Sequence, residues 1–156
     1  MKIIDTHVHF HTPGTRNQGA KDYLLKEGLV LAGTDGEYRG LKKYMGIDNV
    51  AVSVNAPVAL SPEEAVSANR QTAGFDKKDP SVICLGAMHP GMDNPGKEIK
   101  YIAGQGFKGI KMHPQEQDFI RMRRALKPFT RHARTTGFIL FFTQEQGQSL
   151  SLTRLR

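Results

Sequence analysis

The clearest strand in the sequence lies at residues 106–114, which read Gly106-Phe107-Lys108-Gly109-Ile110-Lys111-Met112-His113-Pro114. The pattern predicts a strand over 106–112 that ends at the His-Pro pair. An equivalent stretch precedes it, because residues 81–88 also predict a strand that ends at a His-Pro pair. A helix is expected between the two strands at about residues 94–103. This order indicates parallel strands joined by a helical crossover.

The same alternation extends over most of the chain. The capping-box spacing of Ser61-Pro62-Glu63-Glu64 predicts the start of a helix that ends before Gly74. The remaining elements are strands at 2–6, 49–54 and 138–143, and helices at about 36–45 and 119–136, the last with Pro128 inside it. Together these make about five strands and four intervening helices.

This pattern predicts an α/β fold of the parallel (β/α) barrel type, in an incomplete form with about five strands of a TIM-like barrel. A chain of 156 residues falls short of the ~250 residues that a complete eightfold barrel needs. Residues 1–143 are expected to form the N-terminal part of such a barrel. The Gln- and Ser-rich residues 144–156 show no periodicity and are expected to form a mobile C-terminal tail.

Composition sets the expected surroundings of the protein. An apolar fraction of 38% with 24% charged residues is typical of a soluble globular protein, and we expect it to be cytoplasmic, with no membrane partner. Cys84 is the single cysteine, so no intrachain disulfide can form. The net charge of +7 comes from residues 120–156, which hold 8 of the 22 Lys and Arg residues and 1 of the 15 acidic ones.

The basic stretch could in principle bind nucleic acid. On a helix over 119–136, however, its cationic side chains would spread over several faces, and no recognised binding motif accompanies them. These residues are Arg121, Arg123, Arg124, Lys127, Arg131 and Arg134. We therefore expect no nucleic-acid partner, and we interpret the basic stretch as the mark of an atypical C-terminus.

The strongest chemical feature is the sequence Asp5-Thr6-His7-Val8-His9 at the end of the first strand. Side chains alternate along a strand, so Asp5, His7 and His9 are expected on one face. Two imidazoles at this spacing can bind one cation, and the carboxylate can join them or orient a ring. The alternative is two solvated histidines in a turn. His11 is expected to be a loop residue.

The second feature is the pair Lys111 and His113 on the strand at 106–112. Both are expected to face the barrel interior together with Gly109, while Ile110 and Met112 face the helices. A buried lysine is costly unless it is paired, which favours a functional role. Lys111 could bridge metals after carbamylation, hold a substrate carboxylate or pair with Asp5. His89 ends the preceding strand and is interpreted as a structural residue.

These two motifs, Ile4-Asp5-Thr6-His7-Val8-His9-Phe10 and the Gly106–Pro114 stretch, resemble the N-terminal half of the amidohydrolase-related family of metal-dependent TIM-barrel enzymes. The resemblance covers roughly residues 1–143. It implies a divalent metal, often zinc, that His7 and His9 hold, with Lys111 and His113 as catalytic residues. It also implies a metal-activated water that attacks an amide, ester or lactone of a small-molecule substrate, or in one branch a decarboxylation.

The chain departs from the family near its end. Family members usually carry a histidine ligand after the fifth strand, where this sequence reads Leu140-Phe141-Phe142-Thr143-Gln144. Phe142 would occupy the ligand position, and the later histidine and aspartate of the family have no counterpart. His7 and His9 alone would leave a cation with too few ligands. The pattern therefore suggests a barrel truncated or altered near its end.

The final strand, over 138–142, would present unpaired backbone groups and a run of apolar side chains. We therefore expect the chain to form a homo-oligomer or to associate with a missing second half. Two functional hypotheses follow. The chain is a metal-dependent hydrolase, active alone or once completed, or it is a non-catalytic barrel fragment that serves as an interaction module.

Overall fold

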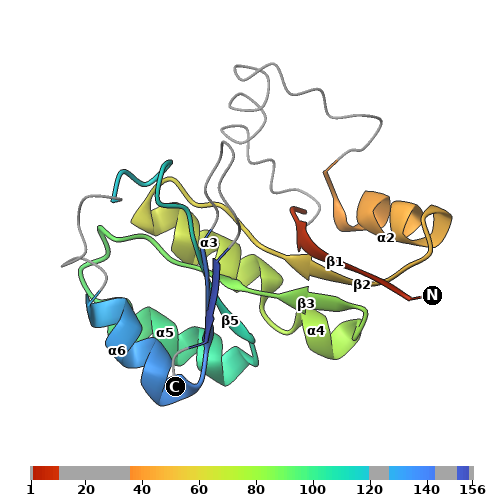
Figure 1. Cartoon of the computed structure of the whole chain (residues 1–156). Coiled ribbons are helices and arrows are strands. Elements are labelled where there is room, and N and C mark those ends of the chain that lie inside the picture. Colours follow the sequence, from red (N-terminus) through yellow and green to blue (C-terminus); the bar gives the residue numbers. More distant parts are fainter. Residues whose placement is uncertain (1, 11–35, 120–126, 143–150, 155–156) are drawn as a thin grey trace.

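The computed structural model describes residues 2–10, 36–119, 127–142 and 151–154 (Figure 1). Strands and helices alternate along this part of the chain. In chain order the elements are β1 (Ile3–Val8), α2 (Tyr38–Ile47), β2 (Val50–Asn55), α3 (Pro62–Thr72), α4 (Phe75–Lys78), β3 (Val82–Cys84), β4 (Gly86–Ala87), α5 (Pro95–Gln105), β5 (Gly109–Met112), α6 (Lys127–Thr136), β6 (Ile139–Phe142) and β7 (Ser151–Arg154). The expected α/β character is confirmed.

The expectation of one barrel-type sheet is wrong. The strands form two sheets, a three-stranded one in the order β1-β2-β3 and a four-stranded one in the order β4-β5-β6-β7. All neighbours in the first sheet are parallel, as are β4, β5 and β6 in the second. The described strands therefore make no closed barrel, and no single sheet runs through them.

The division between the sheets falls inside the stretch where the sequence predicts one strand, residues 81–88. Leu85 separates β3 from β4, and its backbone N–H donates to the Asn55 carbonyl at 3.0 Å. One residue later, Gly86 pairs with Ile110 of β5 instead. The pairing partner therefore changes from β2 to β5 between Leu85 and Gly86. A Cβ at Gly86 would stand 2.6 Å from the terminal methyl group of Ile102, so β4 and α5 pack closely here and a larger residue would require the Ile102 side chain to move.

The last strand, β7, also departs from the barrel pattern, because it pairs with β6 in the antiparallel direction. Residues 143–150 between them are fewer than the ~12 that a parallel crossover requires. β7 lies within residues 144–156, where the sequence predicted no regular element. It also pairs with β6 along the edge that was expected to be free.

The helix ends follow from capping residues. Ser61 caps α3, since its hydroxyl accepts a hydrogen bond from the Glu64 N–H at 3.2 Å, as the capping-box spacing predicted. Asn94 caps α5 in the same way, with the Lys97 N–H as donor at 3.0 Å. α5 runs past Gly104 and ends at Gly106, whose φ of 92° suits glycine. α6 is described over Lys127–Thr136 and contains Pro128, while residues 120–126 of the predicted helix lie outside the described residues.

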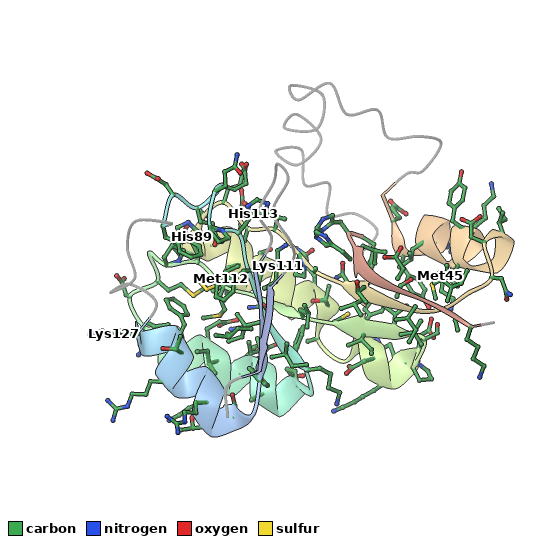
Figure 2. All side chains as sticks on the ribbon, in the orientation of Figure 1. Met45, His89, Lys111, Met112, His113 and Lys127 are labelled. Carbon is green, nitrogen blue, oxygen red and sulfur yellow. The ribbon has the colours of Figure 1, made fainter. Side chains whose placement is uncertain are left out.

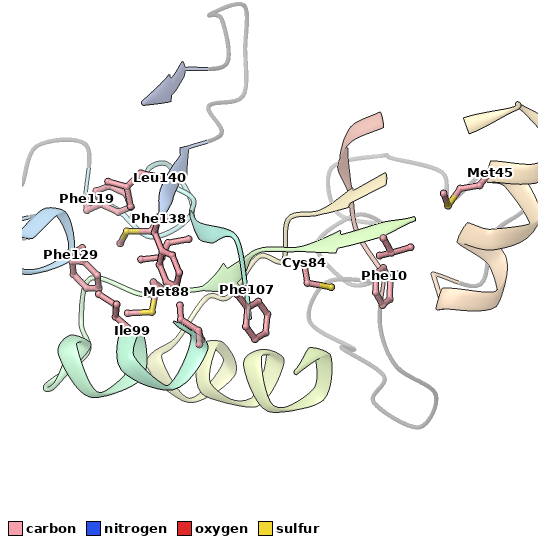
Figure 3. Close-up of a cluster of buried hydrophobic side chains, with 14 residues drawn as sticks. Phe10, Met45, Cys84, Met88, Ile99, Phe107, Phe119, Phe129, Phe138 and Leu140 are labelled. Carbon is pink, nitrogen blue, oxygen red and sulfur yellow. The ribbon is translucent and has the colours of Figure 1, made fainter. Parts of the chain in front are cut away.

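The core lies between the sheets and the helices that cover them (Figure 3). Ile110 and Met112 of β5 are buried in it, on the side predicted from the alternation. α5 contributes Ile99 and Ile102, and α6 contributes Phe129. The helices α5 and α6 lie side by side in Figure 1 and pack against each other. Lys111 lies between Ile110 and Met112 in β5. Because side chains alternate along a strand, the burial of these two residues in the core directs Lys111 to the opposite face of the sheet.

A buried polar cluster joins α3, α5 and β4. Arg70 forms two hydrogen bonds with the Glu98 carboxylate, at 2.7 and 2.9 Å, and its guanidinium stacks over Tyr101 at 3.3 Å. The Asn69 amide nitrogen donates to Glu98 and to the Ala87 carbonyl, while its oxygen accepts from the Ala87 N–H. The cluster satisfies buried polar groups of three elements and links β4 to α3 and α5.

Asp79 links α2 to the start of β3. Its carboxylate accepts hydrogen bonds from Tyr38 Oη at 2.5 Å and Ser81 Oγ at 2.6 Å, and forms an ion pair with Lys42 at 3.0 Å. Burial alone raises the pKa of Asp79, but the hydrogen bonds from Ser81, Tyr38 and Lys42 outweigh it and hold that pKa well below its ordinary value of 3.8. The hydrogen bond to Asp79 raises the pKa of Tyr38 to about 12.

This cluster predicts a loss of stability in acid. The folded-state pKa of Asp79 lies below the unfolded value, so its stabilisation is complete above about pH 5 and declines as the pH falls through the folded value. Asp79→Asn should lower the free energy of unfolding by about 1–2 kcal/mol at pH 7. Near pH 3 the loss should be clearly smaller. Urea unfolding of both proteins at both pH values measures this, and an equal loss at the two would contradict it.

Among the helices in the described ranges, none has both the length and the apolar character needed to cross a bilayer.

Candidate functional site

The structure brings the two histidines of the first motif together at the end of β1. The ring centroids of His7 and His9 are 4.8 Å apart, with the rings in an edge-to-face arrangement at 74°. His7 is partly exposed and His9 is exposed. Asp5, two residues before His7, accepts a hydrogen bond from the His7 backbone N–H at 3.1 Å. The two imidazoles are therefore adjacent and accessible to solvent, and the Asp5 carboxylate stabilises the backbone next to His7.

The end of β1 is anchored to the end of β2. The Phe10 N–H donates to the Asn55 side-chain oxygen at 3.2 Å, and the Ala56 N–H donates to the Val8 carbonyl at 2.9 Å. The buried Phe10 ring packs against Phe75, with ring centroids 5.2 Å apart. These contacts hold the backbone on both sides of His9, so the imidazoles project from a fixed part of the sheet.

Lys111 comes from β5, in the other sheet, and reaches the same site. Its Nζ lies 3.5 Å from His7 Nε2, although 104 residues separate the two in sequence. The Lys111 side chain is 1% exposed. In the sheet it stands opposite Ala87 of β4, whose small side chain leaves room beside the lysine. The sequence predicted an inward-facing Lys111 and a His7 on the same face as Asp5 and His9, and the structure brings Lys111 and His7 into contact.

His113 follows Lys111 at the end of β5 and is also buried. Its Nδ1 accepts a hydrogen bond from the Glu116 N–H at 3.3 Å. Since Nδ1 acts as acceptor, the neutral ring carries its proton on Nε2. Figure 2 shows Lys111 and His113 along the same strand end. The end of β5 thus supplies two of the predicted catalytic side chains.

The electrostatics of the cluster keep His7 neutral. Burial, together with the nearby positive charge of Lys111 and the neighbouring His113, lowers the pKa of His7 to about 4, against an opposite effect of Asp5. At neutral pH the imidazole is therefore uncharged and has a lone pair to offer. This is the form of histidine that binds a metal ion or accepts a proton.

Two other reactive side chains lie outside this cluster. His89 Nδ1 accepts a hydrogen bond from the Gly91 N–H at 3.0 Å, which closes the turn after β4 and fits the structural role expected from the sequence. Cys84 is buried in the core, and burial raises the pKa of its thiol to about 12. A thiol with this pKa is protonated at neutral pH, so Cys84 is no nucleophile there.

The metal-binding chemistry of the cluster has a clear limit. Residues 2–10, 36–119, 127–142 and 151–154 contain no group of three or more His, Cys, Asp and Glu side chains that could hold a metal ion. Phe142, at the position where the resemblance places a histidine ligand, packs against the core, with its ring 6.3 Å from that of Phe119. His11, Arg121, Arg123 and Arg124 lie outside the described residues.

Sequence reasoning missed Gln117, which is bound to the backbone of His113. The side-chain oxygen of Gln117 accepts from the His113 N–H at 3.0 Å. Its amide nitrogen donates to the Ala59 carbonyl at 2.7 Å and to the Met88 carbonyl at 2.8 Å. No pattern in the sequence pointed to this residue, because glutamine is common on surfaces and its partners lie far away along the chain.

A scan against protein-family models and a search of curated proteins both give no match for this chain.

Proposed function

We propose that this chain is a metal-dependent hydrolase of the amidohydrolase-related type, with a divalent cation, zinc by preference, held by His7 and His9. The observation that carries the proposal is the meeting of a buried lysine from β5 with a neutral histidine from β1, 3.5 Å apart. The chain maintains this arrangement at a cost, because a lysine buried to this extent loses its hydration. Such a cost is typical of functional sites.

The donor chemistry fits a divalent cation in part. Two neighbouring imidazoles, one of them kept neutral, supply the nitrogen ligands that zinc favours. A catalytic zinc ion usually takes three protein ligands, and the described residues supply these two. When bound, the ion would lower the pKa of a coordinated water to ~7 and so provide hydroxide at neutral pH.

The chain's own residues have separate tasks in this proposal. Lys111 places a cationic group next to His7, where it can hold a substrate carboxylate or stabilise the oxyanion that forms at an attacked carbonyl. His113 has a proton on Nε2 and can donate it in a hydrogen bond to the substrate or to the leaving group. A cationic group and a proton donor of this kind would serve the hydrolysis of an amide, ester or lactone of a small molecule. In the decarboxylase alternative, Lys111 would hold the carboxylate that is lost.

Zinc binding tests the proposal. Equilibrium dialysis of the wild-type protein should give about one zinc ion per chain, and the His7→Ala, His9→Ala double variant should bind at least ~10-fold more weakly. His89→Ala is the matched control, because its imidazole ends another strand and closes a turn. It should keep wild-type affinity. Equal zinc binding by the double variant, or no binding by the wild type, would contradict the proposal.

The second candidate is a non-catalytic interaction module. It is favoured by β1, whose residues Ile3 and Ile4 are 40% and 61% exposed although they belong to a strand. Apolar residues on an outer strand are a common site of strand pairing with a second copy or another chain. A protein that stays free of metal at saturating zinc and forms a dimer that Ile4→Lys disrupts would favour this candidate.

A further inference from the structure

Gln117 joins three segments that end at the same side of the sheets. Ala59 follows β2, Met88 follows β4 and His113 follows β5. The Gln117 side chain bonds to the backbone of all three, at separations of 58, 29 and 4 residues in sequence. It is 8% exposed, so water does not replace these bonds easily. The side chain is therefore a buried connection between strand ends.

The connection requires a primary amide. Two of its partners are carbonyl oxygens, which need N–H donors, and the third is an N–H group, which needs an acceptor. A carboxylate could serve only the third, and an apolar side chain of the same length could serve none. The backbone completes the arrangement, since the Gln117 N–H donates to the His113 carbonyl at 2.9 Å. Glu116, in the same turn, bonds to the His113 ring.

We propose that Gln117 is a positioning residue, which fixes the His113 imidazole relative to the segments after β2 and β4. It acts on the backbone of His113, while the neighbouring Glu116 N–H sets the ring tautomer. The consequence for turnover rests on the proposed hydrolytic function. The positioning of His113 itself can be measured without any substrate or metal.

The test compares Gln117→Met and Gln117→Glu with the matched control Gln71→Met. Gln71 is partly exposed on α3, and among its described contacts it bonds locally, to Ser67 Oγ at 2.8 Å. Amide hydrogen exchange should show the His113 N–H exchanging about tenfold faster in Gln117→Met. Gln117→Glu keeps the oxygen that accepts from the His113 N–H, so its exchange rate for this N–H should lie between those of the wild type and Gln117→Met. The Ser53 N–H in β2, bonded to the Ser81 carbonyl at 2.9 Å and belonging to a residue that is 1% exposed, serves as the reference for global unfolding.

The imidazole of His113 gives the second readout. Its side-chain NMR signals should shift in both Gln117 variants and stay unchanged in Gln71→Met. With zinc and a hydrolysed substrate, Gln117→Met should lower kcat by about 10–100-fold with little change in KM. Unchanged His113 signals and unchanged exchange in a folded Gln117→Met protein would overturn the inference.

Two further outcomes keep the test decisive. If Gln117→Met does not fold, the test is the exchange rate of the side-chain amide protons of Gln117 in the wild type. These protons should exchange slowly, because they are buried and hydrogen-bonded. Fast exchange of these protons would overturn the inference. If the wild type neither binds zinc nor hydrolyses any substrate, the proposed function fails, while the His113 signals still decide whether Gln117 positions the ring. If the wild type shows zinc-dependent turnover and Gln117→Met keeps the same turnover, the inference about Gln117 is overturned while the proposed function stands.

Discussion

Lys111→Met is expected to lower hydrolytic turnover by about 10²–10³-fold while the protein stays at least as stable as the wild type. The lysine Nζ is the cationic group next to His7, and methionine has a similar length without a charge. In the proposed function this substitution removes the group that would hold a substrate anion or stabilise the oxyanion. Stability should rise by about 1–2 kcal/mol, because an apolar side chain suits a site that is 1% exposed.

The pKa of His7 gives an independent check on Lys111. The lysine is one of the groups that lower this pKa to about 4, so in metal-free Lys111→Met the value should rise toward 6.5. Lys108→Met is the control, since Lys108 is exposed just before β5. NMR titration and urea unfolding measure both effects. A Lys111→Met protein with full turnover, or with stability several kcal/mol lower, would show that the lysine is structural.

Gly109→Ala should lower the free energy of unfolding by about 3 kcal/mol or more. Gly109 opens β5 opposite Ile139 of β6, and a Cβ there would fall well inside the contact distance of the Ile139 carbonyl oxygen. That oxygen belongs to the backbone of a paired strand, so β6 must move to make room. The shift would reach Lys111, two residues further along β5, and turnover should fall with stability.

The matched control for this prediction is Gly104→Ala. Gly104 lies inside α5, and a Cβ there would meet nothing within 4 Å. Alanine should therefore stabilise the protein by about 0.5–1 kcal/mol through its better helix propensity. Urea unfolding curves of the two variants and the wild type measure the difference. A Gly109→Ala protein as stable as Gly104→Ala would mean that β5 and β6 are less closely joined than the structure shows.

Local patterns were enough to predict several local features of the structure around the candidate site. The alternation of Ile110 and Met112 with Lys111 is a property of a single strand, and the core burial of the two apolar residues follows from it. The spacing of His7 and His9 likewise places two rings near each other on any strand. The capping of α3 by Ser61 depends on contacts within four residues. Features that depend on residues only a few positions apart can be recognised in the sequence alone.

The features that could not be predicted depend on distant contacts. The break between β3 and β4 lies where the pairing partner changes from Asn55 of β2 to Ile110 of β5, and strand patterning contains no information about which strand each residue pairs with. Gln117 acts on carbonyls 29 and 58 residues away, so its role exists only in the folded chain. β7 is a strand because β6 offers a pairing edge, although its own residues show no strand periodicity.

The central claim is that His7 and His9 hold the cation of a hydrolytic site that Lys111 completes. The most direct measurement is turnover of a panel of small esters, amides and lactones, with zinc content and oligomeric state determined on the same samples. The wild type should hydrolyse at least one compound in a zinc-dependent reaction, and the His7→Ala, His9→Ala double variant should be at least about 10³-fold slower. Equal turnover in the two proteins, or no turnover by the wild type at saturating zinc, would contradict the claim.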